Sequence, residues 1–187
     1  MFFKLGRAIK KTRQIGHFNP SIWKITYENK SLYEGQINED KESPNYNKPL
    51  NFGKFSFPNG DVYEGIIDIR GIGKYFHIDG TVYEGQFFKL AKSGQGVERY
   101  LNGDIYKGMF KTNFKHGKGQ TTFSNGDCYD GTYRFGMRHH IGEYIFESKE
   151  KVIGDWDHDE LHGKGRFYFN NGINVDGNFE RSNVKFY

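Results

Sequence analysis

The chain has 187 residues, of which 27 are basic and 23 acidic, and a formal net charge of +4. This mixed charge does not favour nucleic acid as a partner, and the single cysteine, Cys128, excludes an intrachain disulfide. No stretch has the length of a membrane span, and no signal peptide is apparent. Only 35% of residues are hydrophobic, and 18 Phe and 13 Tyr stand beside 25 Gly. This composition favours a thin β-sheet with aromatic rings lying over glycine backbone. The single cysteine favours a location inside the cell.

The first segment, residues 1–21, is a basic arm. Residues 1–27 contain no acidic residue. At helical spacing Phe2, Leu5 and Ile9 fall on one side, which predicts a short amphipathic helix. The arm has four readings: a docking arm for an acidic protein surface such as a microtubule, a membrane-surface anchor, a mitochondrial presequence, or a plain solvated tail. The candidate attachment residues are Lys4, Arg7, Lys10, Lys11 and Arg13.

Residues 22–179 contain a repeat marked by glycines. An aromatic-x-Gly triplet, or a remnant of one, ends at Gly35, Gly65, Gly85, Gly108, Gly131, Gly154 and Gly177, and the spacing settles at 23 residues. A second glycine precedes each of the last six by twelve residues. The pattern predicts seven tandem β-hairpins in an elongated, single-layer antiparallel sheet. Fourteen strands at about 4.8 Å each would extend roughly 65 Å.

The fifth unit shows which turn joins the two strands of a hairpin. A three-residue loop closed by Gly126 in the left-handed conformation pairs Phe123 with Asp127. A two-residue Asn-Gly turn would instead put Tyr129 on the opposite face from Phe123. The three-residue loop is favoured because it places Phe123, Tyr129 and Tyr133 on one face.

The same face of every unit carries aromatic residues, so they form a continuous stripe. The opposite face is mostly polar or small, which predicts one wet side, and Cys128 belongs to it. An apolar surface of this length is expected to be covered, partly by the fold and partly by partners. The residues assigned to a partner-binding aromatic face are Tyr63, Tyr83, Phe87, Tyr100, Tyr106, Phe110, Phe123, Tyr129, Tyr133, Phe146, Trp156 and Phe169.

Two irregularities break the repeat. An insertion around residues 38–50 is polar and has two prolines, so it is either a solvent loop or a contact loop, and three residues are missing between Gly65 and Gly73. The first hairpin has lost its glycine pair and is degenerate. Residues 180–187 form a tail that is expected to fold back on the last strand as a cap. Unpaired end strands predict edge-to-edge self-association.

The motifs of the units resemble MORN repeats (membrane occupation and recognition nexus). The resemblance rests on Tyr83-Glu84-Gly85, on His116-Gly117-Lys118-Gly119 and on Asn125-Gly126-Asp127. It implies an all-β scaffold whose aromatic face or groove receives partner peptides, often helices. The sixth unit departs from the pattern, since Val152-Ile153-Gly154 replaces the triplet, and this predicts a specialised surface there.

No residue pattern predicts catalysis, a metal or a cofactor. His116, His139 and His162 recur every 23 residues, but neighbouring equivalents lie two strands, or about 10 Å, apart and cannot share one zinc ion. The repeat position occupied by Glu84 and Asp130 holds Lys107 in another unit, so its carboxylates are structural. We therefore do not expect an enzyme.

These observations predict a non-enzymatic adaptor that binds other protein subunits of a large intracellular assembly. Because similar repeats are prominent in ciliary radial spokes, the resemblance implies a component of the cytoplasm and cytoskeleton, specifically of the cilium axoneme. The alternative is a peripheral membrane protein with weak contact to anionic lipid, or an accessory subunit of a mitochondrial membrane complex. Nucleic acid is not expected as a partner.

Overall fold

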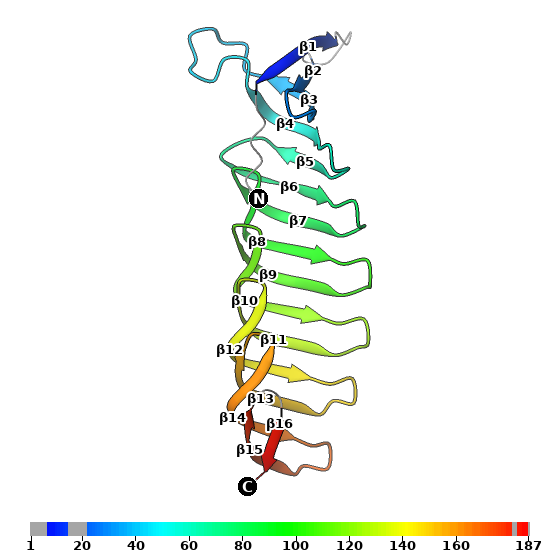
Figure 1. Ribbon diagram of the computed structural model, residues 1–187, viewed down its shortest axis with the longest axis vertical. Coiled ribbons are helices and arrows are strands. Elements are labelled where there is room, and N and C mark those ends of the chain that lie inside the picture. The colour runs from blue at the N-terminus through cyan, green and yellow to red at the C-terminus, as the bar shows by residue number, and fades with distance from the viewer. Residues whose placement is uncertain (1–6, 15–21, 181–182, 187) are drawn as a thin grey trace. The chain divides into compact units, whose positions relative to one another are not determined.

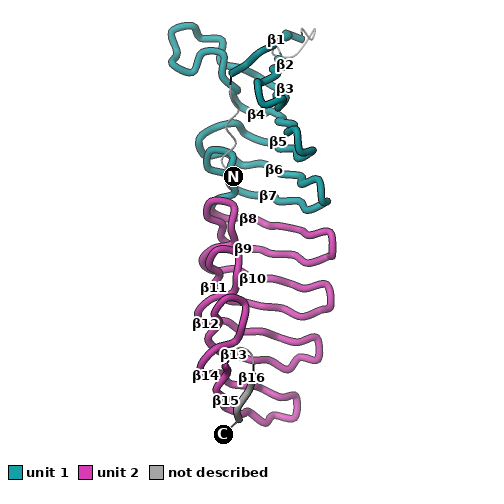
Figure 2. The backbone as a smooth tube through the Cα atoms, in the orientation of Figure 1, with its two compact units in different colours: residues 1–93 teal, residues 94–187 magenta. Residues whose placement is uncertain are grey.

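The protein folds as tandem β-hairpins, which confirms the predicted all-β class. The computed structural model describes residues 7–14, 22–180 and 183–186, which form sixteen strands and no helix. The chain divides into two compact units, residues 1–93 and residues 94–187 (Figure 2). Within each unit every strand pairs antiparallel with the next strand in the sequence (Figure 1).

Each unit is a run of hairpins. Unit 1 holds β1 (Ala8–Gln14), β2 (Ile22–Tyr27), β3 (Leu32–Ile37), β4 (Pro49–Ser56), β5 (Val62–Ile66), β6 (Arg70–Phe76), β7 (Val82–Phe88) and the first residues of β8 (Ala91–Arg99). Unit 2 continues with β9 (Ile105–Lys111), β10 (Phe114–Thr122), β11 (Cys128–Arg134), β12 (Met137–Ile145), β13 (Lys151–Asp157), β14 (Glu160–Tyr168), β15 (Asn174–Glu180) and β16 (Asn183–Phe186).

The predicted number of fourteen strands is wrong, because a strand forms in each terminal segment. Residues 8–14 form β1 rather than the predicted helix, and Arg13 pairs with Trp23 of β2. The backbone of β2 would otherwise lie at an open edge, and the Arg13 guanidinium also lies over the Trp23 ring at 5.8 Å. The rest of that prediction, including Lys4, lies outside the described residues. At the other end β16 pairs with β15, as expected of a cap.

The three-residue turn is confirmed. The Phe123 backbone N–H donates to the Asp127 carbonyl oxygen at 2.9 Å, and the Gly126 N–H donates to the Phe123 carbonyl oxygen at 3.0 Å. Gly126 has φ +93°, and Thr121 pairs with Tyr129 as this register requires. The sequence therefore predicts the pairing register of the two strands of this hairpin correctly, residue by residue.

The core of the hairpins that keep the repeat pattern is a tyrosine ring lying on a pair of glycines. Tyr129 is fully buried, and its hydroxyl donates to the Thr132 carbonyl oxygen at 3.2 Å. A Cβ atom added at Gly131 or Gly142 would lie only 2.4 or 2.2 Å from that hydroxyl oxygen. Only glycine lets the ring approach the backbone this closely. The same arrangement recurs at Tyr63, Tyr83 and Tyr106.

The strands of unit 2 curve (Figure 1), and the large rings of this unit are buried although the sheet has a single layer. The strand pairing shifts register between Lys115 and Gly119 in β10, and between Gly131 and Tyr133 in β11. Such irregularities bend a strand locally and increase its twist. A single sheet can therefore bury large rings such as Tyr133, which is 3% exposed, without a second layer.

An aspartate in the turn holds consecutive hairpins together. Asp127 Oδ1 accepts a hydrogen bond from the Glu147 backbone N–H at 2.8 Å, and Oδ2 accepts one from the Tyr144 hydroxyl at 2.6 Å. The Tyr144 hydrogen bond holds the pKa of the Asp127 carboxyl below its ordinary value. Asp61 and Asp104 accept a backbone N–H from the following hairpin in the same way. The spacing of the Asn-Gly-Asp motif does not by itself predict this role, because the partner groups belong to the next hairpin.

The Asp127→Ala change tests this link. We expect it to lower the free energy of unfolding by about 2 kcal/mol, because it removes from a buried carboxylate the two hydrogen bonds that join the hairpins and a third from Asn125. Chemical denaturation followed by circular dichroism measures the effect. Asp130→Ala, at an exposed site of the same strand pair, should change stability by less than about 0.5 kcal/mol.

The effect should also depend on pH. A carboxyl whose folded pKa is depressed stabilises the fold above its unfolded pKa, and this contribution is lost as the pH falls through the folded value. The difference between wild type and Asp127→Ala should therefore be complete at pH 6 and shrink below about pH 4. A difference that stays constant down to pH 2.5 would contradict this account.

Candidate functional site

Most of the predicted partner-binding aromatic residues belong to the core. Eight of the twelve are at most 7% exposed, so a partner cannot cover them without opening the hairpin: Tyr63, Tyr83, Phe87, Tyr106, Phe110, Tyr129, Tyr133 and Trp156. They pack edge to face; the Tyr129 ring, for example, is 5.3 Å from Tyr133 at 88° and 5.2 Å from Trp156 at 80°. Their first role is to hold the hairpins together.

The remaining four, Tyr100, Phe123, Phe146 and Phe169, are half-buried and lie beside the three-residue turns. The binding of a partner by this face stays a prediction, but burial restricts it to these rings and to the half-buried Tyr144 and Phe167 beside them.

A cation covers the core rings of three hairpins. The Lys115 Nζ lies 4.8 Å from the Tyr100 ring and 4.9 Å from the Tyr106 ring, and the Arg138 guanidinium lies 4.3 Å from the Trp156 ring. Lys92 occupies the same position over Tyr83. These cations stand seven residues after the triplet glycines, at intervals of 23, and were not among the residues predicted to matter. That periodicity was the available signal.

The sixth hairpin lacks both the core tyrosine and the cation above the rings, and a pocket of unit 2 lies there. Leu161 stands where the cation would be, and Val152 replaces the tyrosine. A pocket of about 310 Å³ lies beside these two residues. Its other walls include Arg138, Tyr144, Phe146, Trp156, Phe167 and Phe179. This pocket lies at the sixth unit, where the sequence predicts a specialised surface.

Charge at the rim of this pocket is fixed in place. The backbone N–H and Nε of Arg138 donate to Asp159 Oδ1 at 2.8 and 3.1 Å, and Nη2 donates to the Asp159 carbonyl oxygen at 2.6 Å. Tyr144 stays neutral, since burial first and its bond to Asp127 second raise its pKa to about 12. The pocket thus combines flat aromatic walls with one held cation, an arrangement suited to binding rather than to proton transfer.

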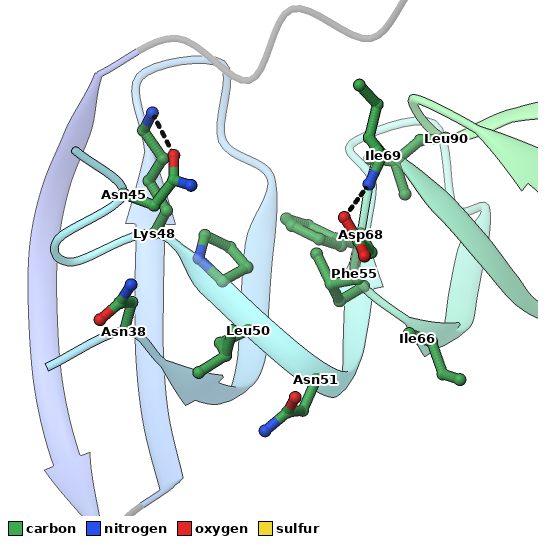
Figure 3. Close-up of a pocket in the computed structure, with 12 residues that line it drawn as sticks. Asn38, Asn45, Lys48, Leu50, Asn51, Phe55, Ile66, Asp68, Ile69 and Leu90 are labelled. Atoms are coloured by element: carbon green, nitrogen blue, oxygen red, sulfur yellow. Dashed lines mark hydrogen bonds between the residues drawn. The ribbon is translucent and has the colours of Figure 1, made fainter. Parts of the chain in front are cut away.

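Unit 1 has a larger pocket, of about 630 Å³, where the two irregularities of the repeat meet (Figure 3). Asn38, Asn45 and Lys48 of the insertion form one wall, and Lys48 Nζ donates to Asn45 Oδ1 at 3.1 Å. The opposite wall includes Ile69, in the shortened connection between β5 and β6, and Leu90. The insertion is therefore part of a concave surface, which favours the contact-loop reading over the plain solvent loop.

The described residues hold no group of three or more His, Cys, Asp or Glu side chains that could bind a metal. His139 and His158 both contact the Asp157 carboxylate, at 3.1 and 2.8 Å, and His158 is the main cause of the lowered pKa of Asp157. Burial raises the pKa of the Cys128 thiol, which argues against a reactive nucleophile. Across the same described segments, no helix is long and apolar enough to cross a membrane.

Comparison with known proteins matches both the repeat and the fold. The MORN repeat family matches residues 45–62, 83–105, 106–128, 129–149 and 153–173, more than half of the chain.

A solved structure of the SAS-4 (dCPAP) TCP domain of Drosophila melanogaster, in complex with a proline-rich motif of Ana2 (dSTIL), is 15% identical with a TM-score of 0.54, and the match covers 91% of this chain and 90% of that one. The wild-type TCP10 domain of Danio rerio CPAP is 13% identical with a TM-score of 0.46, covering 100% and 96%. Identities this low show the fold alone. No curated protein is similar in sequence.

Replacing a core ring tests the assignment of the two faces. Tyr129→Ala should lower the free energy of unfolding by about 3 kcal/mol, because it removes a ring that two neighbouring hairpins share. Lys107→Glu, on the exposed opposite face, should have almost no effect. Thermal and urea unfolding of both variants measures this, and equal destabilisation would mean that the faces are inverted.

Proposed function

The chain belongs to the MORN repeat family, and from this premise we propose that it is a non-enzymatic adaptor that binds other protein subunits of a large assembly. The observation that supports this best is the pocket of unit 2, whose walls are aromatic and whose rim carries the fixed Arg138 guanidinium. It lies where the sixth hairpin departs from the repeat, so the fold alone does not account for it. Its walls suit the side chains of a partner segment better than a metabolite that needs many polar contacts.

A proline-containing extended segment fits this pocket. Prolines pack against flat, partly exposed rings such as those of Tyr144 and Phe167, and an extended proline-rich backbone loses little conformational freedom on binding. The similar TCP domain of SAS-4 is in complex with a proline-rich motif, which supports the same class of ligand here. An amphipathic helix is the second candidate, since the resemblance to MORN proteins implies it.

The proposed assembly is the cilium axoneme, with the protein in a radial-spoke-like position. Arg7, Lys10 and Lys11 are exposed at the β1 edge of unit 1, where they would meet an acidic surface such as a microtubule. The rival proposal is a peripheral membrane protein, or an accessory subunit of a mitochondrial membrane complex, in which the same residues contact anionic lipid.

The pocket is tested by Phe167→Ser. Removing this half-buried wall should weaken capture of axonemal proteins and of a proline-rich peptide by tenfold or more, measured by affinity purification with mass spectrometry and by fluorescence anisotropy. Phe114→Ser is the matched control, because Phe114 is 51% exposed and lies outside the pocket. Equal binding by wild type and Phe167→Ser would exclude the pocket as the partner site.

The attachment residues are tested by charge reversal. A Lys10→Glu, Lys11→Glu variant should sediment less with axonemes, and its binding should depend less on salt, because exposed charge contacts are screened as ionic strength rises. Lys107→Glu in unit 2 is the control. Loss of flotation with anionic liposomes, without loss on axonemes, would favour the membrane alternative, and unchanged binding to both would exclude attachment through β1.

A further inference from the structure

The outer face of unit 1 carries an apolar row that the repeat does not require. Six residues lie beside the glycine positions on the side away from the tyrosine rings, and four of them are apolar: Ile22, Phe52, Ile66 and Ile72, which are 36, 66, 46 and 59% exposed, while the other two are Gln36 and Gln86. In unit 2 the residues at the equivalent repeat positions are mostly polar: Gln95, Met109, Lys118, Thr132, Ile141, Asp155, Lys164 and Asn178. An exposed apolar row confined to one unit indicates a surface that is covered in the working protein.

Next to this row runs a ladder of alternating charge. One residue from each of the strands β2 to β7 is the direct cross-strand partner of the next: Lys24, Glu34, Lys54, Glu64, Lys74 and Glu84. The ion pairs within it measure 3.4, 2.9 and 3.3 Å. The corresponding row of unit 2 does not alternate: Val97, Lys107, Gln120, Asp130, Glu143, Ile153, Arg166 and Asp176.

The charges of the ladder are complementary to those of a second copy of the ladder that runs in the opposite direction. It has six members that alternate in sign, so reading it from β7 to β2 places a glutamate wherever the forward order has a lysine. A two-fold axis that runs parallel to the strands between β4 and β5 produces this reversal in a second copy laid face to face. Lys54 then lies opposite Glu64 of the partner subunit, and Phe52 opposite Ile66 of the partner subunit. One operation thus matches every charge of the ladder with a countercharge and brings Phe52 and Ile66 together at the axis, while Ile22 lies opposite Gln86 of the partner subunit.

The shape of the face fits the same operation. A hollow of about 400 Å³ lies between Ile22 and Phe52, over the Gly35 and Gly53 backbone, with Gln36 at its edge. The axis that pairs β4 with β5 also pairs β3 with β6. It therefore places Ile72 of the partner subunit, which is more than half exposed, over this hollow.

We infer that the outer face of β2 to β7 is an isologous interface at which a second copy of this chain binds. Three independent features point to the same axis: the apolar row, the reversible charge ladder and the hollow opposite Ile72. An anionic membrane is a poorer match, because Glu34, Glu64 and Glu84 would face it together with the lysines. The interface uses a sheet face and so differs from the edge-to-edge pairing that open strand ends would allow.

A pair of isoleucines provides the first test. Ile72 and Ile141 both precede a glycine of the pair, on the same face of the repeat, and are 59 and 60% exposed. The wild-type chain should be a dimer by sedimentation equilibrium. Ile72→Lys should weaken dimerisation about a hundredfold, since each dimer buries the site twice, and Ile141→Lys should not. A monomeric wild type, equal effects of the two changes, or vesicle binding that only Ile72→Lys abolishes would overturn the proposal.

Crosslinking tests the axis and does not depend on a change in affinity. In a Cys128→Ser background, Lys24→Cys and Glu84→Cys are combined in one chain and treated with a short bismaleimide. The two sites lie five strands, roughly 24 Å, apart within a chain, but opposite each other across the proposed dimer. The double variant should give a covalent dimer and each single variant should give none. Equal crosslinking by the single variants would contradict the axis, as would a dimer joined only through β1 or β16.

Discussion

The contact of a tyrosine ring with a pair of glycines is the constraint on which the rest of the structure depends. In the fifth hairpin the Tyr129 ring covers Gly131 and Gly142, and a Cβ atom at either would collide with the hydroxyl. The ring supplies to a single sheet the buried apolar area that other folds obtain from a second layer. Glycines at both positions and curvature of the strands follow from this one contact. The period of 23 residues is the spacing that repeats it.

Surfaces available for binding arise where this constraint is relaxed. In the sixth hairpin Val152 cannot span the glycine pair as a tyrosine does, and Leu161 replaces the cation above it, so the rings there no longer close the groove. In unit 1 the insertion before β4 and the shortened connection after β5 open the other pocket. Both of these departures from the repeat coincide with a pocket in the structure. Repeats that keep the pattern bury their rings and leave little for a partner to contact.

The sequence predicted the register of the hairpins because that register is local. Phe123, Gly126 and Asp127 are close in the chain, and one turn type satisfies all three. The strand at residues 8–14 could not be predicted in this way, because the pairing of Arg13 with Trp23 depends on the open edge of β2 and not on the spacing of Phe2, Leu5 and Ile9. The contacts of Lys115 and Arg138 with the rings were also missed, since exposed lysines and arginines in a mixed-charge sequence look alike until the rings beneath them are placed.

The two faces of the sheet are constrained to different degrees, and this difference indicates where function can be sought. On the inner face, which carries the tyrosine rings, the contact of rings with glycines constrains almost every position, so folding explains an aromatic residue there. No such contact constrains the outer face, since the positions of Phe52 and Ile72 in unit 1 are occupied by Lys118 and Lys164 in unit 2. An apolar residue that the fold does not need must be explained by something outside the hairpin. Exposed isoleucines are therefore more informative about partners in this protein than its many buried tyrosines.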